Sequence, residues 1–67
     1  MYTLTIQYDS NTTDYIQDVN TFSFATDLLL RGVYCEQPTQ NTLVFESEQD
    51  LAYATLAYTG KADLAWD

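Results

Sequence analysis

The stretch TFSFATDLLLRGV, residues 21–33, decides the fold class, because it predicts a helix between segments that alternate like strands. Thr21 or Ser23 can cap the start of this helix. Gly32 is placed to adopt the left-handed conformation that ends a helix, and Val33 can supply the hydrophobic contact that accompanies such an end. The apolar residues that share one side at helical spacing are Phe24, Ala25, Leu28 and Leu29.

The chain before this helix begins with an alternating pattern that predicts a strand. Apolar and aromatic residues occupy every second position, so one face of the strand meets a core while the other is polar and uncharged. The sheet is therefore expected to be covered on one side only. The alternating apolar positions are Tyr2, Leu4, Ile6 and Tyr8.

Residues 14–20, DYIQDVN, follow a run of turn-forming residues and allow two interpretations. Tyr15, Gln17 and Val19 fit one face of a second strand that forms a hairpin with the first. Alternatively, Asp14 and Gln17 fit a capping box that starts a short helical turn. We favour the strand.

The segment after Gly32 predicts another hairpin. VYCE, residues 33–36, and TLVFES, residues 42–47, have the composition of strands. QPTQN, residues 37–41, supplies turn-forming residues and the only proline of the chain, so it is expected to be the loop between them.

SEQDLAYATLAYTG, residues 47–60, predicts a second helix. Ser47 is placed as its N-cap, with Asp50 at the third helical position as a variant of the capping box. Gly60 is placed as its stop. The last residues, 62–67, either add a short strand or lay Trp66 against the domain.

These elements predict a single domain over residues 1–67 that belongs to the α+β class. The expected order is β-β-α-β-β-α, with an antiparallel sheet of three to four strands and two helices packed on one of its faces. A chain this short buries only a small core, so its stability depends on good packing or on a partner.

The second predicted helix is apolar nearly all round, which a domain of this size has little means to bury. In one interpretation its alanines are exposed, and Leu51, Leu56 and one tyrosine face the core. In the other, a flank with Tyr53 or Tyr58 stays open for another chain, because tyrosine combines a large rigid area with a polar tip. The acidic rim beside that flank would consist of Glu46, Glu48 and Asp50.

Charge narrows the choice of partner. Ten carboxylates face two cations, Arg31 and Lys61, which gives a net charge of −8. Nucleic-acid binding needs a basic surface that displaces counterions, and anionic membranes repel an acidic protein, so neither is expected as a direct partner. The expected partner is a basic protein, unless the charge serves solubility alone.

Catalytic and cofactor chemistry finds little support in the sequence. The chain contains no histidine, which is the commonest general base, and no glycine-rich phosphate loop. Cys35 is the lone cysteine, which excludes an internal disulfide, and we interpret it as a buried structural thiol. The acidic stretch that begins at Asp9 lacks the glycine and the final acid of a calcium loop. We therefore predict no enzyme, no metal site and no cofactor.

The expected location is intracellular, in the cytoplasm, with a host cell as one option. The N-terminus lacks the basic segment and apolar run of a secretory signal, and apolar runs such as residues 28–30 are too short to span a bilayer. A single cysteine fits a reducing compartment.

The favoured function is that of a small acidic binding protein that inhibits a basic, nucleic-acid-binding partner by imitating nucleic acid. Dispersed carboxylates suit a phosphate-like array better than an acidic tail, which would be one block. The size, acidity and lack of catalytic residues resemble phage-encoded inhibitors of host defence, including anti-restriction and anti-CRISPR proteins, as a type and without a shared motif. The expected partner-binding residues are Asp14, Tyr15, Asp18, Glu46, Glu48, Asp50 and Tyr53.

The alternative function is that of an assembly module. It would homodimerise or dock into a larger complex through the apolar, tyrosine-bearing face of the second helix, and its charge would be incidental. Salt distinguishes the two functions, because the binding of a mimic weakens as salt screens its charges, whereas an apolar face hardly responds.

Overall fold

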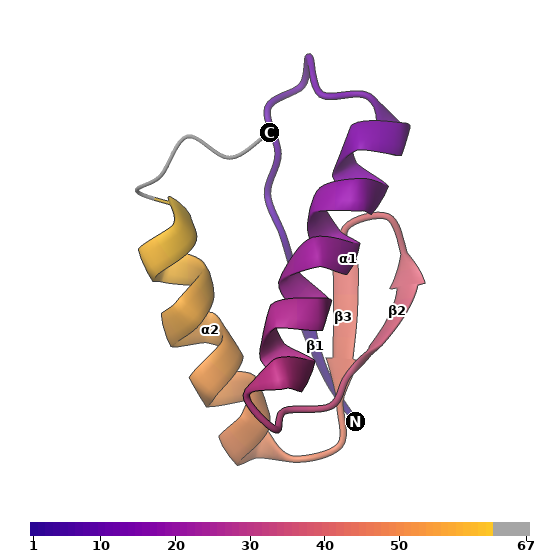
Figure 1. The fold of residues 1–67 in the computed structure, drawn as a ribbon. Coiled ribbons are helices and arrows are strands. Elements are labelled where there is room, and N and C mark those ends of the chain that lie inside the picture. Colours follow the sequence, from indigo (N-terminus) through magenta and orange to yellow (C-terminus); the bar gives the residue numbers. More distant parts are fainter. Residues whose placement is uncertain (63–67) are drawn as a thin grey trace.

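The computed structural model describes residues 1–62, with side chains up to Tyr58, and shows a three-stranded antiparallel sheet with two helices (Figure 1). Its elements are β1 (Tyr2–Thr5), α1 (Asp14–Leu30), β2 (Glu36–Thr39), β3 (Thr42–Phe45) and α2 (Glu48–Ala62). The strand order is β1-β3-β2. Since β1 and β2 both run antiparallel to β3, they are parallel to each other, and α1 connects them across the central strand.

The α+β class is confirmed, but the order is β-α-β-β-α, and the strand predicted at residues 14–20 is wrong. These residues form the first turns of α1. The N-cap is Thr13, whose Oγ1 accepts a hydrogen bond from the Ile16 backbone N–H at 3.2 Å. Gln17 strengthens this start, because its Nε2 donates to the backbone carbonyl before the cap at 3.0 Å. The helical alternative was right in type, although the cap is not Asp14.

The C-terminal end of α1 matches the prediction. Gly32 has a φ of +88°, in the left-handed region. Its N–H donates to the Leu29 carbonyl oxygen at 2.9 Å, and the Val33 N–H donates to the Leu28 carbonyl oxygen at 2.9 Å. These two bonds make a Schellman end, and both Val33 and Leu28 lie in the core, as such an end requires.

The β2–β3 hairpin is confirmed, but its first strand lies closer to the turn than predicted. β2 covers Glu36–Thr39 rather than residues 33–36, so only Gln40 and Asn41 separate the two strands. Pro38 therefore lies within a strand. It is tolerated because β2 is an edge strand, where a missing N–H need not break the sheet.

One core lies between the sheet and both helices. Leu43 and Phe45 are fully buried on alternate positions of β3, so both point to the same face of the sheet. Residues of α1 and α2 share this core, and Figure 1 shows both helices on that side. The buried apolar residues are Ile6, Phe24, Leu28, Val33, Leu43, Phe45 and Ala54.

Thr21, which the sequence suggested as a cap, lies in the middle of α1 and is fully buried. Its hydroxyl donates to the Gln40 carbonyl oxygen at 2.6 Å, which ties α1 to the hairpin turn. The Tyr8 hydroxyl lies 2.9 Å from the Thr21 Oγ1, and burial raises the pKa of Tyr8. The buried hydroxyl of Thr21 thus has two hydrogen-bond partners, which offset the free-energy cost of removing it from water.

α2 begins where the sequence predicts and ends later. The Ser47 Oγ accepts a hydrogen bond from the Asp50 N–H at 3.1 Å, as expected of the N-cap. The helix continues through Gly60 to Ala62, so Gly60 is not its stop. Glycine weakens a helix interior by about 1 kcal/mol but does not by itself end one. The strand or tryptophan lid expected after Ala62 falls on residues 63–67, outside the described part of the chain.

Replacing Gly32 with alanine is expected to lower the free energy of unfolding by about 1–2 kcal/mol, because a Cβ is unfavourable at a left-handed φ. The added Cβ would meet no atom within 4 Å, so the loss measures backbone conformation alone. Urea denaturation measures it, with Gly32→Asn as the control, since asparagine tolerates this conformation better. An alanine variant as stable as the wild type would contradict the left-handed end.

Candidate interaction surfaces

The predicted partner-binding residues fall into two groups at opposite ends of the molecule. The N-termini of α1 and α2 point to opposite ends of a body whose longest extent is 32 Å (Figure 1). The structure therefore does not bring the predicted residues together in one patch. The group at the start of α1 is Asp14, Tyr15 and Asp18, and the group around the start of α2 is Glu46, Glu48, Asp50 and Tyr53.

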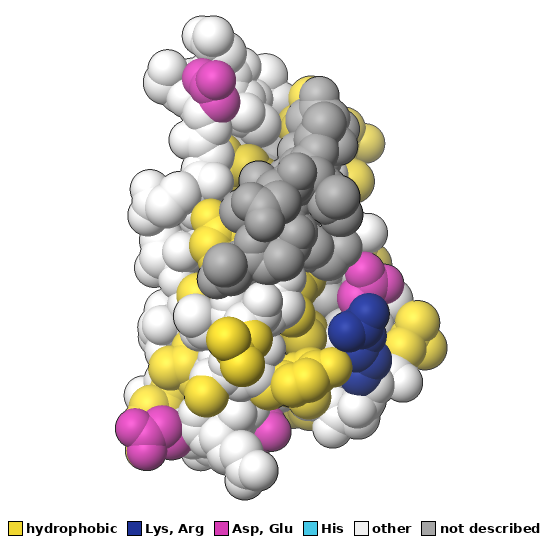
Figure 2. Space-filling view, turned by 90° about the vertical axis from the view of Figure 1, so that its left-hand side faces the viewer, with side chains coloured by type: hydrophobic (Ala, Val, Ile, Leu, Met, Phe, Trp, Pro, Cys, Tyr) yellow, Lys and Arg dark blue, Asp and Glu magenta, His cyan; other side chains and the backbone are white. Residues whose placement is uncertain are grey.

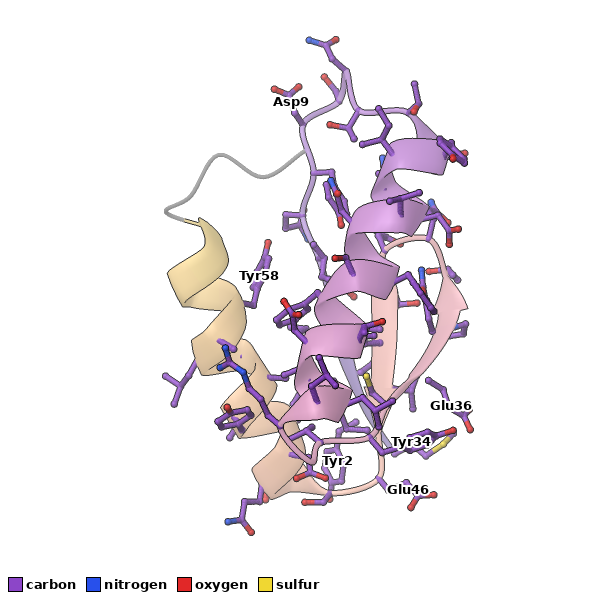
Figure 3. The ribbon with its side chains drawn as sticks, viewed as in Figure 1. Tyr2, Asp9, Tyr34, Glu36, Glu46 and Tyr58 are labelled. Carbon is purple, nitrogen blue, oxygen red and sulfur yellow. The ribbon has the colours of Figure 1, made fainter. Side chains whose placement is uncertain are left out.

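The group around α2 gains Glu36 from the sheet. Glu36 pairs with Val44, one residue before the end of β3, and Glu46 follows that end directly. Figure 3 shows both glutamates at the same end of the molecule, together with Tyr2 and Tyr34. We call this end, formed by Glu36, Glu46, Glu48 and Asp50, the acidic end.

Sequence analysis missed Glu36, Tyr2 and Tyr34 as members of the acidic end, because strand register alone brings them there. Tyr2 pairs with Phe45, which places the start of β1 beside the β3–α2 turn. All three side chains are exposed. The sequence does not show which strands are neighbours in the sheet, so it does not show that these residues lie close together.

Local electrostatics favours acids at the start of α2. Glu48 and Asp50 lie in its first turn, where the free backbone N–H groups attract negative charge. Tyr53, one turn further on, is 40% exposed, and its hydroxyl accepts a hydrogen bond from the Arg31 guanidinium at 3.4 Å. That contact raises the pKa of Arg31. The predicted anchor Tyr53 is thus held beside a cation at the edge of the acidic end.

The opposite group lies around the start of α1. Asp14 and Asp18 are exposed, and the Asp18 Oδ1 accepts a hydrogen bond from the Gln37 Nε2 at 2.9 Å, which ties α1 to β2. Asp9 lies near this end (Figure 3) and accepts a hydrogen bond from the Asn11 N–H at 3.0 Å. We call Asp9, Asp14 and Asp18 the distal acids.

The core side of α2 differs from the expectation. Leu51 and Tyr58 pack against the core as expected, but Leu56 is 74% exposed and Ala54 takes the buried position. Alanine fits there because its small side chain lets the helix approach the sheet closely. The Tyr58 hydroxyl accepts a hydrogen bond from the Gln7 N–H at 3.0 Å, so Tyr58 supports the fold.

Figure 2 views the molecule from the α2 side and shows hydrophobic side chains over the lower part of this face, with acidic side chains at its margins. Among the exposed apolar side chains of α2 are Leu56 and Tyr53. Within the described residues, Tyr53 therefore lies on an exposed flank of α2 together with Leu56, whereas Tyr58, the other tyrosine considered for an open flank, packs against the core.

A second apolar surface lies on the side of α1 that faces away from the core, and the sequence analysis missed it. Leu29, expected in the core, is more than half exposed, and Phe22 is 65% exposed although Phe24 is buried. A helix places residues two positions apart on nearly opposite sides, so α1 is apolar on two sides. We call this surface, formed by Tyr15, Val19, Phe22, Leu29 and Leu30, the outer face of α1.

A cavity of about 150 Å³ opens beside the outer face of α1. Cys35 forms part of its wall and packs against the core, but it is only half-buried, so this thiol is less buried than the sequence suggested. Burial raises the pKa of Cys35. The lining residues are Phe22, Ala25, Thr26, Leu29, Tyr34 and Cys35.

The described residues contain neither a metal-holding cluster nor a membrane-spanning helix. Within residues 1–62 no three side chains among histidine, cysteine, aspartate and glutamate cluster so as to hold a metal ion. None of the helices in this part of the chain has the length and apolar character needed to cross a bilayer. Comparisons with protein-family models, with curated proteins and with solved structures found no match.

Two phenylalanines of α1 test the assignment of its faces. Phe24→Ala is expected to lower the free energy of unfolding by about 3–5 kcal/mol, because it empties the core. Phe22→Ala, two positions away, should change it by less than about 0.5 kcal/mol, because Phe22 is exposed. Urea denaturation of both variants measures the difference. Equal losses would mean that both side chains share one face, as in a strand.

Alkylation tests the position of Cys35. Iodoacetamide should modify it more slowly than free cysteine near neutral pH, because the raised pKa of this half-buried thiol leaves less thiolate. The rate should rise with pH until it passes the raised pKa. Phe22→Ala removes one wall of the cavity and should speed the reaction. Modification of the wild type at the rate of free cysteine would contradict the half-buried position.

Proposed function

We propose that this protein is a non-enzymatic, acidic binding protein that inhibits a basic partner by occupying its nucleic-acid-binding groove. The supporting observation is the exposure of carboxylates at both ends of an elongated body. These side chains point into solvent and can reach a partner without rearrangement of the fold. The exposed acids are Glu36, Glu46 and Glu48 at the acidic end and Asp9, Asp14 and Asp18 at the other.

The charge density supports imitation of nucleic acid. A net charge of −8 on a body 32 Å long corresponds to about one negative charge per 4 Å. One nucleic-acid strand carries a phosphate about every 3.4 Å, and a duplex carries about twice that charge per length. The protein therefore approaches the charge density of a single strand, and a groove that binds single strands is the better-matched target.

Aromatic side chains at the acidic end support the same target. Tyr2 and Tyr34 are exposed there beside the carboxylates (Figure 3), and the exposed Tyr53 follows Asp50 by one turn of α2. Grooves that bind single strands combine cationic side chains with aromatic side chains on which bases stack. Carboxylates meet the cations of such a groove, and tyrosine rings can take the place of stacked bases.

The test is a pull-down with the tagged protein from nuclease-treated lysate, at low and high salt. Nucleic-acid-binding proteins should be retained at low salt, released by high salt, and released by single-stranded DNA at constant ionic strength, because ligand and protein compete for one groove. Retention of a partner that neither salt nor DNA releases would contradict the proposal.

Two triple variants with equal charge locate the contact. Glu36→Gln, Glu46→Gln and Glu48→Gln neutralise the acidic end, and Asp9→Asn, Asp14→Asn and Asp18→Asn neutralise the distal acids. We expect the first triple to weaken binding to the captured partner by at least about tenfold, and more than the second, because Tyr2, Tyr34 and Tyr53 flank the acidic end whereas Tyr15 is the exposed tyrosine beside the distal acids. Equal losses would show that net charge alone sets the affinity.

Docking through the uncovered flank of α2 is the second candidate function. The observation that favours it is the exposure of Leu56 and Tyr53 on one side of this helix. A partner held there should stay bound at high salt, because apolar contacts are not screened. Leu56→Ala should then release the partner, whereas the triple neutralisation of the acidic end should not.

A further inference from the structure

The outer face of α1 is complementary to itself. Tyr15 projects near its N-terminal end and is 77% exposed, while the cavity bounded by Phe22, Leu29 and Tyr34 opens about two turns along the same side. A twofold axis between two copies sets each tyrosine over the cavity of the other, as an isologous interface requires. We propose that this face is a dimerisation surface, occupied by a second copy of the chain with the two α1 helices antiparallel.

The spacing along α1 suits helix pairing. Tyr15, Val19, Phe22 and Leu29 follow one another at steps of four, three and seven residues, with Thr26 at the intermediate position. Alternating steps of four and three keep side chains along one line of contact between two packed helices. The core side of the same helix is already used by the sheet, so the outer face is the side left for pairing.

The exposed area is large enough for a dimer. A buried aromatic side chain removes about 150–250 Å² from water. Tyr15, Phe22 and Tyr34 are 77%, 65% and 59% exposed, so together they offer about 300–500 Å² in each copy. Two copies then bury about 600–1,000 Å² before the aliphatic side chains are counted, which approaches the roughly 1,000 Å² of a biological interface.

Charge within α1 favours the antiparallel arrangement. The helix carries Asp14 and Asp18 at its N-terminal end and Asp27 near its C-terminal end, where Arg31 offsets the charge of Asp27. Parallel helices would set the two N-terminal pairs of acids against each other. Antiparallel helices set each N-terminal pair against the C-terminal end of the other α1, whose two charged side chains have opposite signs. This arrangement brings the distal acids of one copy to the acidic end of the other, and salt must screen that repulsion.

The net charge of −8 per copy still opposes dimerisation at low salt. Salt screens this repulsion over a Debye length of about 8 Å at physiological ionic strength, so the dimer should strengthen as salt rises. Binding of a basic partner should weaken over the same range. The sign of the salt effect therefore separates the two proposals.

Sedimentation velocity of the purified protein over a concentration series, at low and high salt, tests the proposal. We expect a monomer–dimer equilibrium whose dissociation constant falls as salt rises. A protein that stays monomeric at every concentration and salt would overturn the proposal and leave the face to a different occupant. A dimer that salt weakens would overturn it as well, because charge pairing would then hold the copies together.

Point variants locate the dimer contact. Phe22→Ala and Tyr15→Ala should each raise the dissociation constant by about tenfold or more, since buried aromatic anchors carry most of the energy of such contacts. Leu56→Ala is the matched control, because Leu56 is as exposed as these residues but lies on α2. Circular dichroism and thermal unfolding verify the fold of each variant. A dimer lost with Leu56→Ala and kept with Phe22→Ala would overturn the assignment to α1.

A cross-link tests the antiparallel orientation. In Tyr15→Cys, mild oxidation should join position 15 of one copy to Cys35 of the other, because Cys35 lines the cavity that receives Tyr15. The double variant Tyr15→Cys, Cys35→Ser should not cross-link, because antiparallel helices keep the two copies of position 15 apart. A covalent dimer of the double variant, or none from the single variant while sedimentation shows a dimer, would overturn this orientation.

Discussion

The pairing of β1 with β3 is the interaction on which the rest of the structure depends. Tyr2–Thr5 align with Thr42–Phe45, so the pairing closes a loop that contains α1 and β2. A further bond extends it, because the Ile6 N–H donates to the Asn41 carbonyl oxygen at 2.7 Å. Closing so long a loop costs only slightly more entropy than closing a shorter one. With neighbours on both edges, β3 becomes the central strand, and its buried Leu43 and Phe45 form the floor against which both helices pack.

The same pairing also creates the acidic end. It sets the start of β1 beside the β3–α2 turn, and β2 brings Glu36 to that end from its other side. Carboxylates that are dispersed in the sequence thereby gather at one end of a body 32 Å long. The acids at the start of α2 cost little there, because they lie near the free N–H groups of its first turn. Fold and surface charge thus follow from one strand register.

Sequence patterns predicted the parts of the fold that local chemistry governs. The cap at Ser47 and the Schellman end at Gly32 each need a few neighbouring residues, and both are confirmed. The error at residues 14–20 arose because Tyr15, Gln17 and Val19 alternate as the residues of a strand do. In the structure they belong to α1, and none of them is part of the buried core. The helix end predicted at Gly60 is wrong, because glycine is favourable at the end of a helix but does not by itself end one.

The candidate surfaces were harder to predict than the fold for a physical reason. An apolar residue in a helix carries the same sequence signal whether it faces the core or solvent, and only the position of the sheet decides between them. Phe22 and Phe24 show this, because they differ by two positions and one of them is exposed while the other is buried. The predicted acids are exposed except for the half-buried Asp50, but their division between two ends of the molecule depends on a topology that the sequence does not display.

The two proposed surfaces reinforce each other. α1 runs from the distal acids toward the acidic end, so antiparallel pairing of two copies sets the distal acids of one at the same end as the acidic end of the other. Each end of the dimer then carries both groups and attracts a basic partner more strongly than either group alone. A partner bound there neutralises the repulsion that opposes dimerisation. By linkage, dimerisation must then tighten the binding of that partner by the same factor.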